Sequence, residues 1–237
     1  MTTIWHDLEC GGYAADLPLW RALAAEQGDP VLEIGAGTGR VAIDLARQGH
    51  RVTAVDHDSA LLAELRRRAV GLELATVLAD AREFELDERF ALCLMPMQTV
   101  QLLGGEQGRR VFLERAHRHL NEGGLLAAAI ASRLEAYEVP DGGPALVPDM
   151  CERDGIVYAS HPTAIRTDGD GFLLERRRET VTPDGRRIVE PNTVKLDRVL
   201  PSELEREAAL AGLKSAGRAT IPATADYSGS EVVILRA

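Results

Sequence analysis

The chain has 237 residues, with 27 Lys and Arg against 37 Asp and Glu, so its formal net charge is −10. A chain of this length can bury a sizeable core, as one domain or as one domain with an insertion. The acidic balance argues against proteins that bind nucleic-acid phosphates or anionic lipid, and it favours a small-molecule partner.

Three cysteines, Cys10, Cys93 and Cys151, occur without a C-x-x-C spacing. This pattern argues against a disulfide framework and against a structural zinc site, so no metal is expected. Residues 1–10 lack the basic and apolar regions of a signal peptide, and no apolar stretch approaches the roughly 18–20 residues that span a bilayer. We therefore expect a cytoplasmic protein.

The first half of the chain alternates short apolar runs with helical periodicity. Residues 30–34 predict a buried strand, residues 40–49 a helix, and residues 51–56 a second strand that ends on a carboxylate. Further elements are predicted in chain order, namely a helix from 59, a strand at 72–80, a strand at 90–94, a helix at 106–120 and a strand at 125–131. Strands and helices that alternate with short connections predict an α/β fold with a Rossmann-like, doubly wound sheet.

The pattern changes after residue 140. Three β-rich runs, at about 156–166, 171–182 and 187–199, are separated by Asp-Gly turns, which is a hairpin signal. They predict an inserted antiparallel β meander. A capped helix at 201–210 and a last strand at 231–236 follow.

The most informative motif is the glycine-rich turn at residues 35–39, between the first strand and its helix. Glycines there let a ligand approach the backbone N–H groups at the helix N-terminus, because no Cβ stands in the way. The dinucleotide pattern G-x-G-x-x-G is not satisfied. Its third glycine comes one place early, at Gly39, and Arg40 occupies the expected position.

The stretch Val31-Leu-Glu-Ile-Gly-Ala-Gly-Thr-Gly39 resembles motif I of the class I S-adenosylmethionine-dependent methyltransferases, with Glu33 as the acid before the first glycine. The resemblance continues at Asp56, where the family's acid binds both ribose hydroxyls, and at Asp80, where the family's acid binds the adenine amino group. It implies a cofactor site for S-adenosylmethionine made by Tyr13, Glu33, Gly35, Ala36, Gly37, Thr38, Gly39, Arg40, Asp56, His57, Asp80, Ala81, Arg82, Met95 and Met97.

The loop after the fourth strand, Met95-Pro-Met-Gln-Thr99, lacks the Asn/Asp-Pro-Pro-aromatic signature of amino-directed nucleic-acid methyltransferases. Methylation of a nucleic-acid base is therefore disfavoured. The loop is similar to that of small-molecule members of the family, in which Gln98 would orient the substrate or the donor. Gln98 could equally cap the next helix.

The N-terminal stretch at 12–20 looks like the lid segment of small-molecule methyltransferases, where a tyrosine, here Tyr13, closes over the donor. It also fits an amphipathic helix that packs on the sheet, and both interpretations can hold together.

No general base can be identified, so the catalytic residues stay unknown. His161 is a candidate substrate contact or a structural residue. We expect His117 and His119 to face solvent, and we expect the run Arg176–Arg178 to form a solvated face.

Together these features predict a single methyltransferase domain. Its parts are an N-terminal lid and helical segment at 1–29, a donor-binding core at 30–139 and 200–237, and an antiparallel insert at 140–199 that would cover the acceptor pocket. The expected reaction is methyl transfer from S-adenosylmethionine to an N or O atom of a small metabolite.

Two alternatives stay open. One is a catalytically idle protein that binds the donor or a partner, since no base is identified. The other is a nicotinamide-dependent oxidoreductase, which fits less well because both lysines, Lys195 and Lys214, lie outside the first half of the chain. A homodimer is also open.

Overall fold

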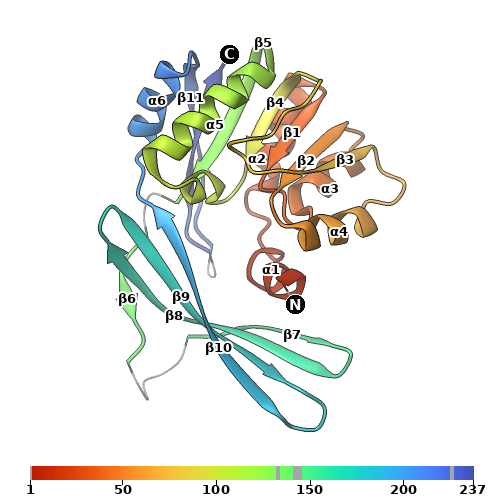
Figure 1. The fold of residues 1–237 in the computed structure, drawn as a ribbon, viewed down its shortest axis with the longest axis vertical. Helices are drawn as coiled ribbons and strands as arrows, with labels where there is room; N and C mark the ends of the chain where they lie inside the picture. The colour runs from red at the N-terminus through yellow and green to blue at the C-terminus, as the bar shows by residue number, and fades with distance from the viewer. Residues whose placement is uncertain (1, 132–133, 141–145, 225–226) are drawn as a thin grey trace. The chain divides into compact units, whose positions relative to one another are not determined.

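The computed structural model describes residues 2–131, 134–140, 146–224 and 227–237. The chain forms two compact units. Unit 1 comprises Met1–Gly12 and Leu134–Arg198, and unit 2 comprises Tyr13–Arg133 and Val199–Ala237. Unit 2 contains the elements predicted for the donor-binding core, and unit 1 contains those predicted for the antiparallel insert. The helices and strands of the two units are labelled in Figure 1.

Unit 2 is built on a seven-stranded sheet with the order β11-β12-β5-β4-β1-β2-β3. The strands are β1 (Val31–Ile34), β2 (Val52–Asp56), β3 (Leu74–Leu78), β4 (Phe90–Met95), β5 (Leu120–Ile130), β11 (Lys214–Ile221) and β12 (Ser230–Arg236). Strands β1 to β5 pair in parallel, whereas β12 is antiparallel to both β5 and β11. The doubly wound sheet that the sequence predicts is confirmed.

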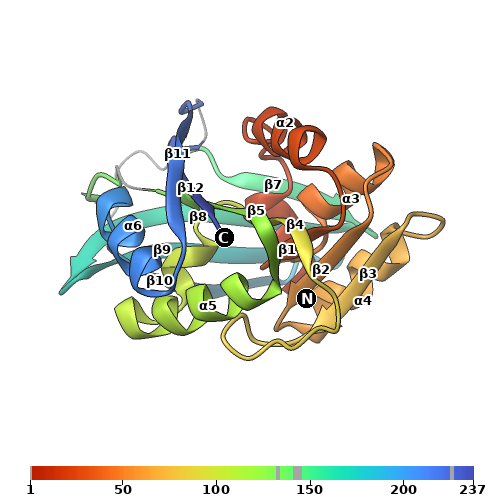
Figure 2. The same cartoon turned by 90° about the horizontal axis from the view of Figure 1, so that it is seen from above.

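Helices cover both faces of this sheet (Figure 2). They are α2 (Leu17–Gln27), α3 (Arg40–Arg47), α4 (Ser59–Arg68), α5 (Gly105–His119) and α6 (Pro201–Leu210), with a 3₁₀ turn, η1, at Thr99–Leu102. Alternate residues of each strand point to opposite faces. In β1, for example, Val31 packs in the core cluster with α2 and α3, whereas Leu32 packs in the cluster with α5 and α6.

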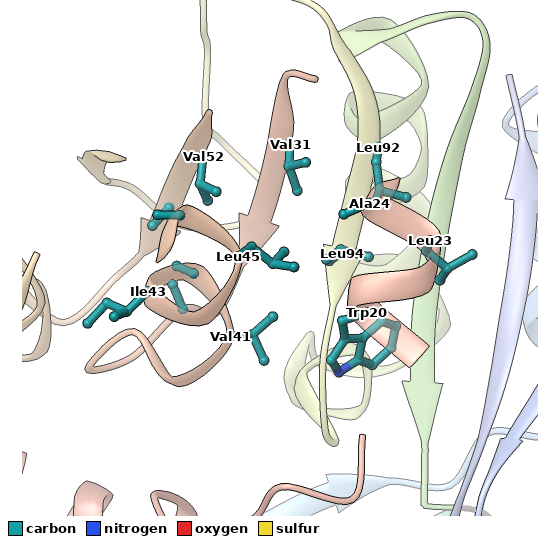
Figure 3. Packing of buried hydrophobic residues seen from close by; sticks show 14 of the residues in the cluster. Trp20, Leu23, Ala24, Val31, Val41, Ile43, Leu45, Val52, Leu92 and Leu94 are labelled. Atoms are coloured by element: carbon teal, nitrogen blue, oxygen red, sulfur yellow. The ribbon is translucent and has the colours of Figure 1, made fainter. Parts of the chain in front are cut away.

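The core on the first face joins α2 and α3 to the central strands. Trp20 and Leu23 of α2 pack in one cluster with Leu94 of β4, and Val41 and Leu45 of α3 belong to the same cluster (Figure 3). Because β1 is central and buried on both sides, all four of its residues are buried, including the acidic Glu33. This packing holds the carboxyl ends of β1, β2 and β4 at one edge of the sheet.

Strand order reverses between β1 and β4. The chain proceeds from β1 to β2 and β3 on one side, and from β4 to β5 on the other. In open α/β sheets this switch point is where ligands bind, outside the carboxyl ends of the strands. The glycine-rich turn follows β1 directly at this point.

Unit 1 is an antiparallel sheet with one helix. Its strands β10, β9, β8 and β6 pair in that order, and β7 also pairs with β8. The elements are α1 (Thr2–Cys10), β6 (Tyr137–Glu138), β7 (Asp149–Arg153), β8 (Ile156–Asp168), β9 (Gly171–Val181) and β10 (Arg187–Asp197). The three predicted runs are therefore the three long strands of this sheet. That they cover an acceptor pocket stays a prediction.

One face of the unit 1 sheet binds α1. The Trp5 ring packs edge-on against Tyr158 at 5.5 Å, and the Glu9 carboxylate accepts two hydrogen bonds from Arg178. Arg176 lies within 3.2 Å of the Asp149 carboxylate. The expected solvated arginine run was therefore wrong for Arg176 and Arg178, whose side chains point to the α1 face, whereas Arg177 is exposed.

The two histidines of α5 also differ from expectation. His119 is buried and accepts a hydrogen bond from the Leu86 backbone N–H at 3.1 Å. His117 is partly buried, with Nδ1 2.8 Å from the Ala211 carbonyl oxygen. The expectation that both face solvent was wrong, because segments distant in sequence supply their partners.

No helix in the described parts of the chain is long and apolar enough to cross a membrane.

Candidate active site

The glycine-rich turn occupies the space between the end of β1 and the start of α3. Gly35 has a φ of +72°, and a Cβ added there would lie 2.4 Å from Thr99 Cγ2. Gly39 has a φ of +92°, and its added Cβ would lie 2.8 Å from Leu65 Cγ. Only glycine meets both demands at these two positions. The turn therefore packs closely at the N-terminus of α3, and its Ala36 N–H donates to the Val55 carbonyl oxygen at 3.1 Å.

Asp56 ends β2 beside this turn and is buried. One of its carboxylate oxygens accepts the Gly37 N–H at 2.8 Å, and the other accepts the Asp58 N–H at 2.9 Å. The two bonds hold the carboxylate against the turn. Each oxygen keeps a second acceptor position, which suits the two hydroxyls of a ribose. His57, the next residue, is exposed.

Glu33 lies in β1 on the same face as α3 and is buried. Burial raises the pKa of its carboxyl to about 8. Its Oε2 atom has no hydrogen-bond partner within the described residues. A buried carboxyl oxygen without a partner costs free energy, so a site that retains one is prepared for a group that donates to it.

Asp80 follows β3 and is partly exposed. Its two oxygens accept hydrogen bonds from the Arg82 side chain at 2.8 and 2.6 Å, and the Arg82 backbone N–H also donates to it. The Arg82 guanidinium lowers the pKa of Asp80 to about 2. An ionised acceptor therefore stands at the strand end next to β2, with Ala81 partly buried beside it.

The loop after β4 places its two methionines differently. The Met95 side chain is fully buried in the core cluster on the α5 face, so only its backbone borders the edge of the sheet. Met97 is partly buried, with a φ of +54°, and it lines a small space together with Gln98. Of the two methionines, Met97 is the one whose side chain is placed to touch a ligand.

Tyr13 is tied to the start of α3 through Arg40. The Arg40 guanidinium donates to the Tyr13 carbonyl oxygen at 2.9 Å and lies 5.2 Å from the centre of its ring. The same guanidinium donates two hydrogen bonds to the buried Asp16 carboxylate, one to each oxygen. Asp16 is a residue that sequence reasoning missed, although Tyr13-Ala-Ala-Asp16 stood in the segment expected to form a lid.

A second aromatic ring packs on Tyr13. Tyr227, from the β11–β12 connection, lies with its ring 4.9 Å from that of Tyr13. Sequence reasoning gave no signal for Tyr227, because it is 214 residues away along the chain. His161, the other predicted substrate contact, lies in unit 1, with Nε2 3.9 Å from Glu179 Oε2.

Residues 31–124 match the family model of a methyltransferase domain. This match covers β1 to β5 up to Gly124, and with it the turn, Asp56, Asp80 and the loop after β4. Over these residues the chain is similar to a methyltransferase domain. The cofactor of such domains is S-adenosylmethionine, and the turn, the two acids at strand ends and the unpartnered Glu33 oxygen fit its adenosyl and amino-acid parts.

Among curated proteins, the chain is 32% identical over 97 residues to a cypemycin N-terminal methyltransferase from a Streptomyces species. The aligned part is 41% of this chain and 40% of that relative, so the chain matches less than half of the relative's length.

Two solved structures share the fold of the methyltransferase domain and extend over nearly the whole chain. The sugar N-methyltransferase KedS8 of Streptoalloteichus has a TM-score of 0.76 at 16% identity, covering 99% of this chain and 92% of that one. The S-adenosylmethionine-bound amino pentose methyltransferase CalS10 of Micromonospora echinaspora has a TM-score of 0.70 at 20% identity, covering 95% and 92%. At these identities the likeness establishes the fold.

Proposed function

We propose that the protein transfers a methyl group from S-adenosylmethionine to a nitrogen or oxygen atom of a small molecule. The observation that carries this proposal is the set of groups at one sheet edge: the glycine turn after β1, Asp56 after β2 and Asp80 after β3, within a matched methyltransferase domain. The neighbouring sugar and amino pentose methyltransferases favour a small-molecule acceptor.

The binding mode follows from strand order. Asp56 would accept from the ribose hydroxyls, Asp80 from the adenine amino group, and the glycine turn would lie against the donor's central part. Since β2 and β3 lie on one side of β1, the donor's adenosine is assigned to that side and its sulfonium end to the β4 side. When bound, the sulfonium supplies an electrophilic methyl group.

The chain's own contribution is then to position both reactants and to exclude water. Methyl transfer is an in-line displacement, and holding donor and acceptor at near-attack distance can supply much of its acceleration. Tyr13, Met97 and Gln98 border the β4 side, where Tyr13 and Met97 are assigned to the sulfonium end of the donor and Gln98 to the acceptor. His57, Arg82 and Ala81 are assigned to the adenosine side.

The experiment that tests this proposal follows the conversion of S-adenosylmethionine to S-adenosylhomocysteine by mass spectrometry. Amino sugars and the matching hydroxy sugars are supplied as acceptors, and the donor alone is the control. Product that carries one additional methyl group, formed in proportion to S-adenosylhomocysteine, is expected for at least one acceptor class. Tight donor binding without turnover for any acceptor would favour the idle alternative.

A homodimer stays a prediction, which light scattering can test.

A further inference from the structure

A small polar space in unit 2 lies on the β4 side of the candidate site. It is lined by residues of three segments, Tyr13, Met97, Gln98, Tyr227, Ser228 and Ser230, and its volume is about 20 Å³. This volume holds about one water molecule. The space therefore has room for one small group, of the size of an amine nitrogen.

The topology brings these segments to the carboxyl edge of the sheet. Met97 and Gln98 follow the end of β4. Strand β12 is antiparallel to β5 with Glu231 opposite Ile130, so the residues just before β12 lie at the end of β5. Tyr13 reaches the same edge through its carbonyl bond to Arg40, the first residue of α3. The space thus lies where the donor's sulfonium end is assigned.

The Tyr13 hydroxyl is the unusual group in this space. Tyr13 is 5% exposed, and its Oη has no hydrogen-bond partner in the parts of the chain that the structure describes. A buried hydroxyl without a partner is costly, so it marks a position prepared for a polar ligand atom. Tyr227 packs its ring on Tyr13 and restricts where that atom can lie.

The chemistry of the lining also selects the acceptor. None of the six described residues around the space is a carboxylate, histidine, lysine or arginine. Burial raises the pKa of the Tyr13 phenol above its usual value, so the hydroxyl stays protonated near neutral pH. An alcohol acceptor needs a base to take its proton during attack, whereas a neutral amine already has a free lone pair.

We propose that the acceptor is an amine whose N–H donates to Tyr13 Oη, with Tyr227 as a residue that positions it. This inference rests on the proposed methyl transfer. The hydrogen bond leaves the nitrogen lone pair free to face the donor. The lone pair forms the new N–C bond to the methyl carbon, while the C–S electron pair returns to sulfur and leaves neutral S-adenosylhomocysteine. The methylated ammonium product then loses a proton to water.

Two donor analogues test the assignment without knowledge of the acceptor. S-adenosylhomocysteine has no group at the methyl position, whereas sinefungin carries an amine there on a carbon that replaces the sulfur. Calorimetry on the full chain gives the ratio of their dissociation constants. Tyr13→Phe keeps the ring and its contacts with Arg40 and Tyr227, and removes only the hydroxyl. We expect it to weaken sinefungin about tenfold, the effect of one charge-assisted hydrogen bond, and to change S-adenosylhomocysteine less than about twofold.

Tyr158→Phe is the matched control, since it also removes the phenol hydroxyl of a buried tyrosine, in unit 1, that does not line this space. We expect its ratio to match that of the wild-type protein. An unchanged ratio in Tyr13→Phe, or equal losses in the two variants, would overturn the assignment to Tyr13 Oη while leaving methyl transfer intact. If the wild-type protein binds neither analogue, the proposed function itself fails, and this inference fails with it.

Discussion

Arg40 binds Asp16 through both carboxylate oxygens, at 2.6 and 2.7 Å, and this pair joins the segment before α2 to the first residue of α3. The Asp16 side chain is fully buried, and that of Arg40 is 12% exposed. Asp16 also accepts a hydrogen bond from the Trp20 indole at 2.8 Å. Since Arg40 in addition holds the Tyr13 carbonyl, the pair fixes Tyr13 beside the glycine turn.

Replacing Arg40 by Met leaves the Asp16 carboxylate buried without its cation. We expect the free energy of unfolding to fall by about 3–5 kcal/mol, because an unpaired buried charge is far costlier than a lost surface pair. Urea denaturation measures this change. The control is Arg21→Ala, which breaks the exposed Arg21–Asp44 pair between α2 and α3 and should cost less than about 1 kcal/mol. Equal losses in both variants would show that burial of the Asp16 pair is unimportant.

Glu33 should give the protein a pH-dependent stability. Burial raises its pKa from 4.5 to about 8, so between these pH values the folded state holds a proton that the unfolded chain has released. The free energy of unfolding that depends on Glu33 is therefore highest below about pH 4.5. It decreases as pH rises from there and levels off above about pH 8.

Glu33→Gln removes this titration and keeps the size of the side chain. The stability of the variant relative to the wild-type protein should rise with pH, by up to about 1.4 kcal/mol per pH unit inside that window. Urea denaturation at pH 5, 6, 7 and 8 measures the difference. A difference that does not vary with pH would contradict a buried, protonated Glu33.

Gly35 is expected to resist substitution for two separable reasons, its positive φ and the close approach of Thr99. Gly49→Ala is the matched control. Gly49 has a φ of +92°, but an added Cβ there would meet no atom within 4 Å. Gly49→Ala should lower the free energy of unfolding by about 1 kcal/mol through the backbone alone. Gly35→Ala should lower it by more, because its Cβ also meets Thr99.

Thr99→Ala tests the steric part. Combined with Gly35→Ala it should recover part of the loss in thermal unfolding, because the Thr99 Cγ2 atom is removed. If the loss in the double variant equals the sum of the two single losses, the Gly35–Thr99 contact does not limit substitution at this position.

Asp80 is expected to recognise the adenine amino group. S-inosylhomocysteine carries an oxygen in place of that group, so the wild-type protein should bind S-adenosylhomocysteine at least about tenfold more tightly, as one charge-assisted hydrogen bond allows. Asp80→Ala should reduce this preference to near unity, measured by calorimetry. Glu83→Ala is the control. Glu83 is an exposed acid near Asp80, and this variant should keep the preference for S-adenosylhomocysteine. A preference that survives in Asp80→Ala would remove Asp80 from the adenine site.

Local patterns predicted the sheet well because each signal lies within a few residues. The apolar run at 31–34, the glycine turn and the Asp-Gly turn at 184–185 required no distant partner. The same Asp-Gly signal at Asp154-Gly155, where both φ angles are positive, was not used, and β7 was missed for that reason.

What sequence could not supply were contacts between distant segments. His119 is buried because the Phe84 ring packs on it at 4.7 Å and Leu86 donates to it. Arg178 is held by Glu9, which is 169 positions away. Tyr227 reaches Tyr13 only because β12 folds back against β5. No periodicity in the sequence indicates such pairs. The contacts of Tyr13 with Tyr227 in the candidate site could therefore be found only in the structure.

We propose that the turn after β1, with Asp56, binds S-adenosylmethionine and not a nicotinamide dinucleotide. Calorimetric titration of the wild-type protein with S-adenosylhomocysteine and with NAD, repeated with Asp56→Ala, tests it most directly. We expect binding of S-adenosylhomocysteine, no binding of NAD, and a loss of affinity in the variant. Tight binding of NAD without binding of S-adenosylhomocysteine would contradict the account, and an unchanged dissociation constant in Asp56→Ala would refute the ribose assignment.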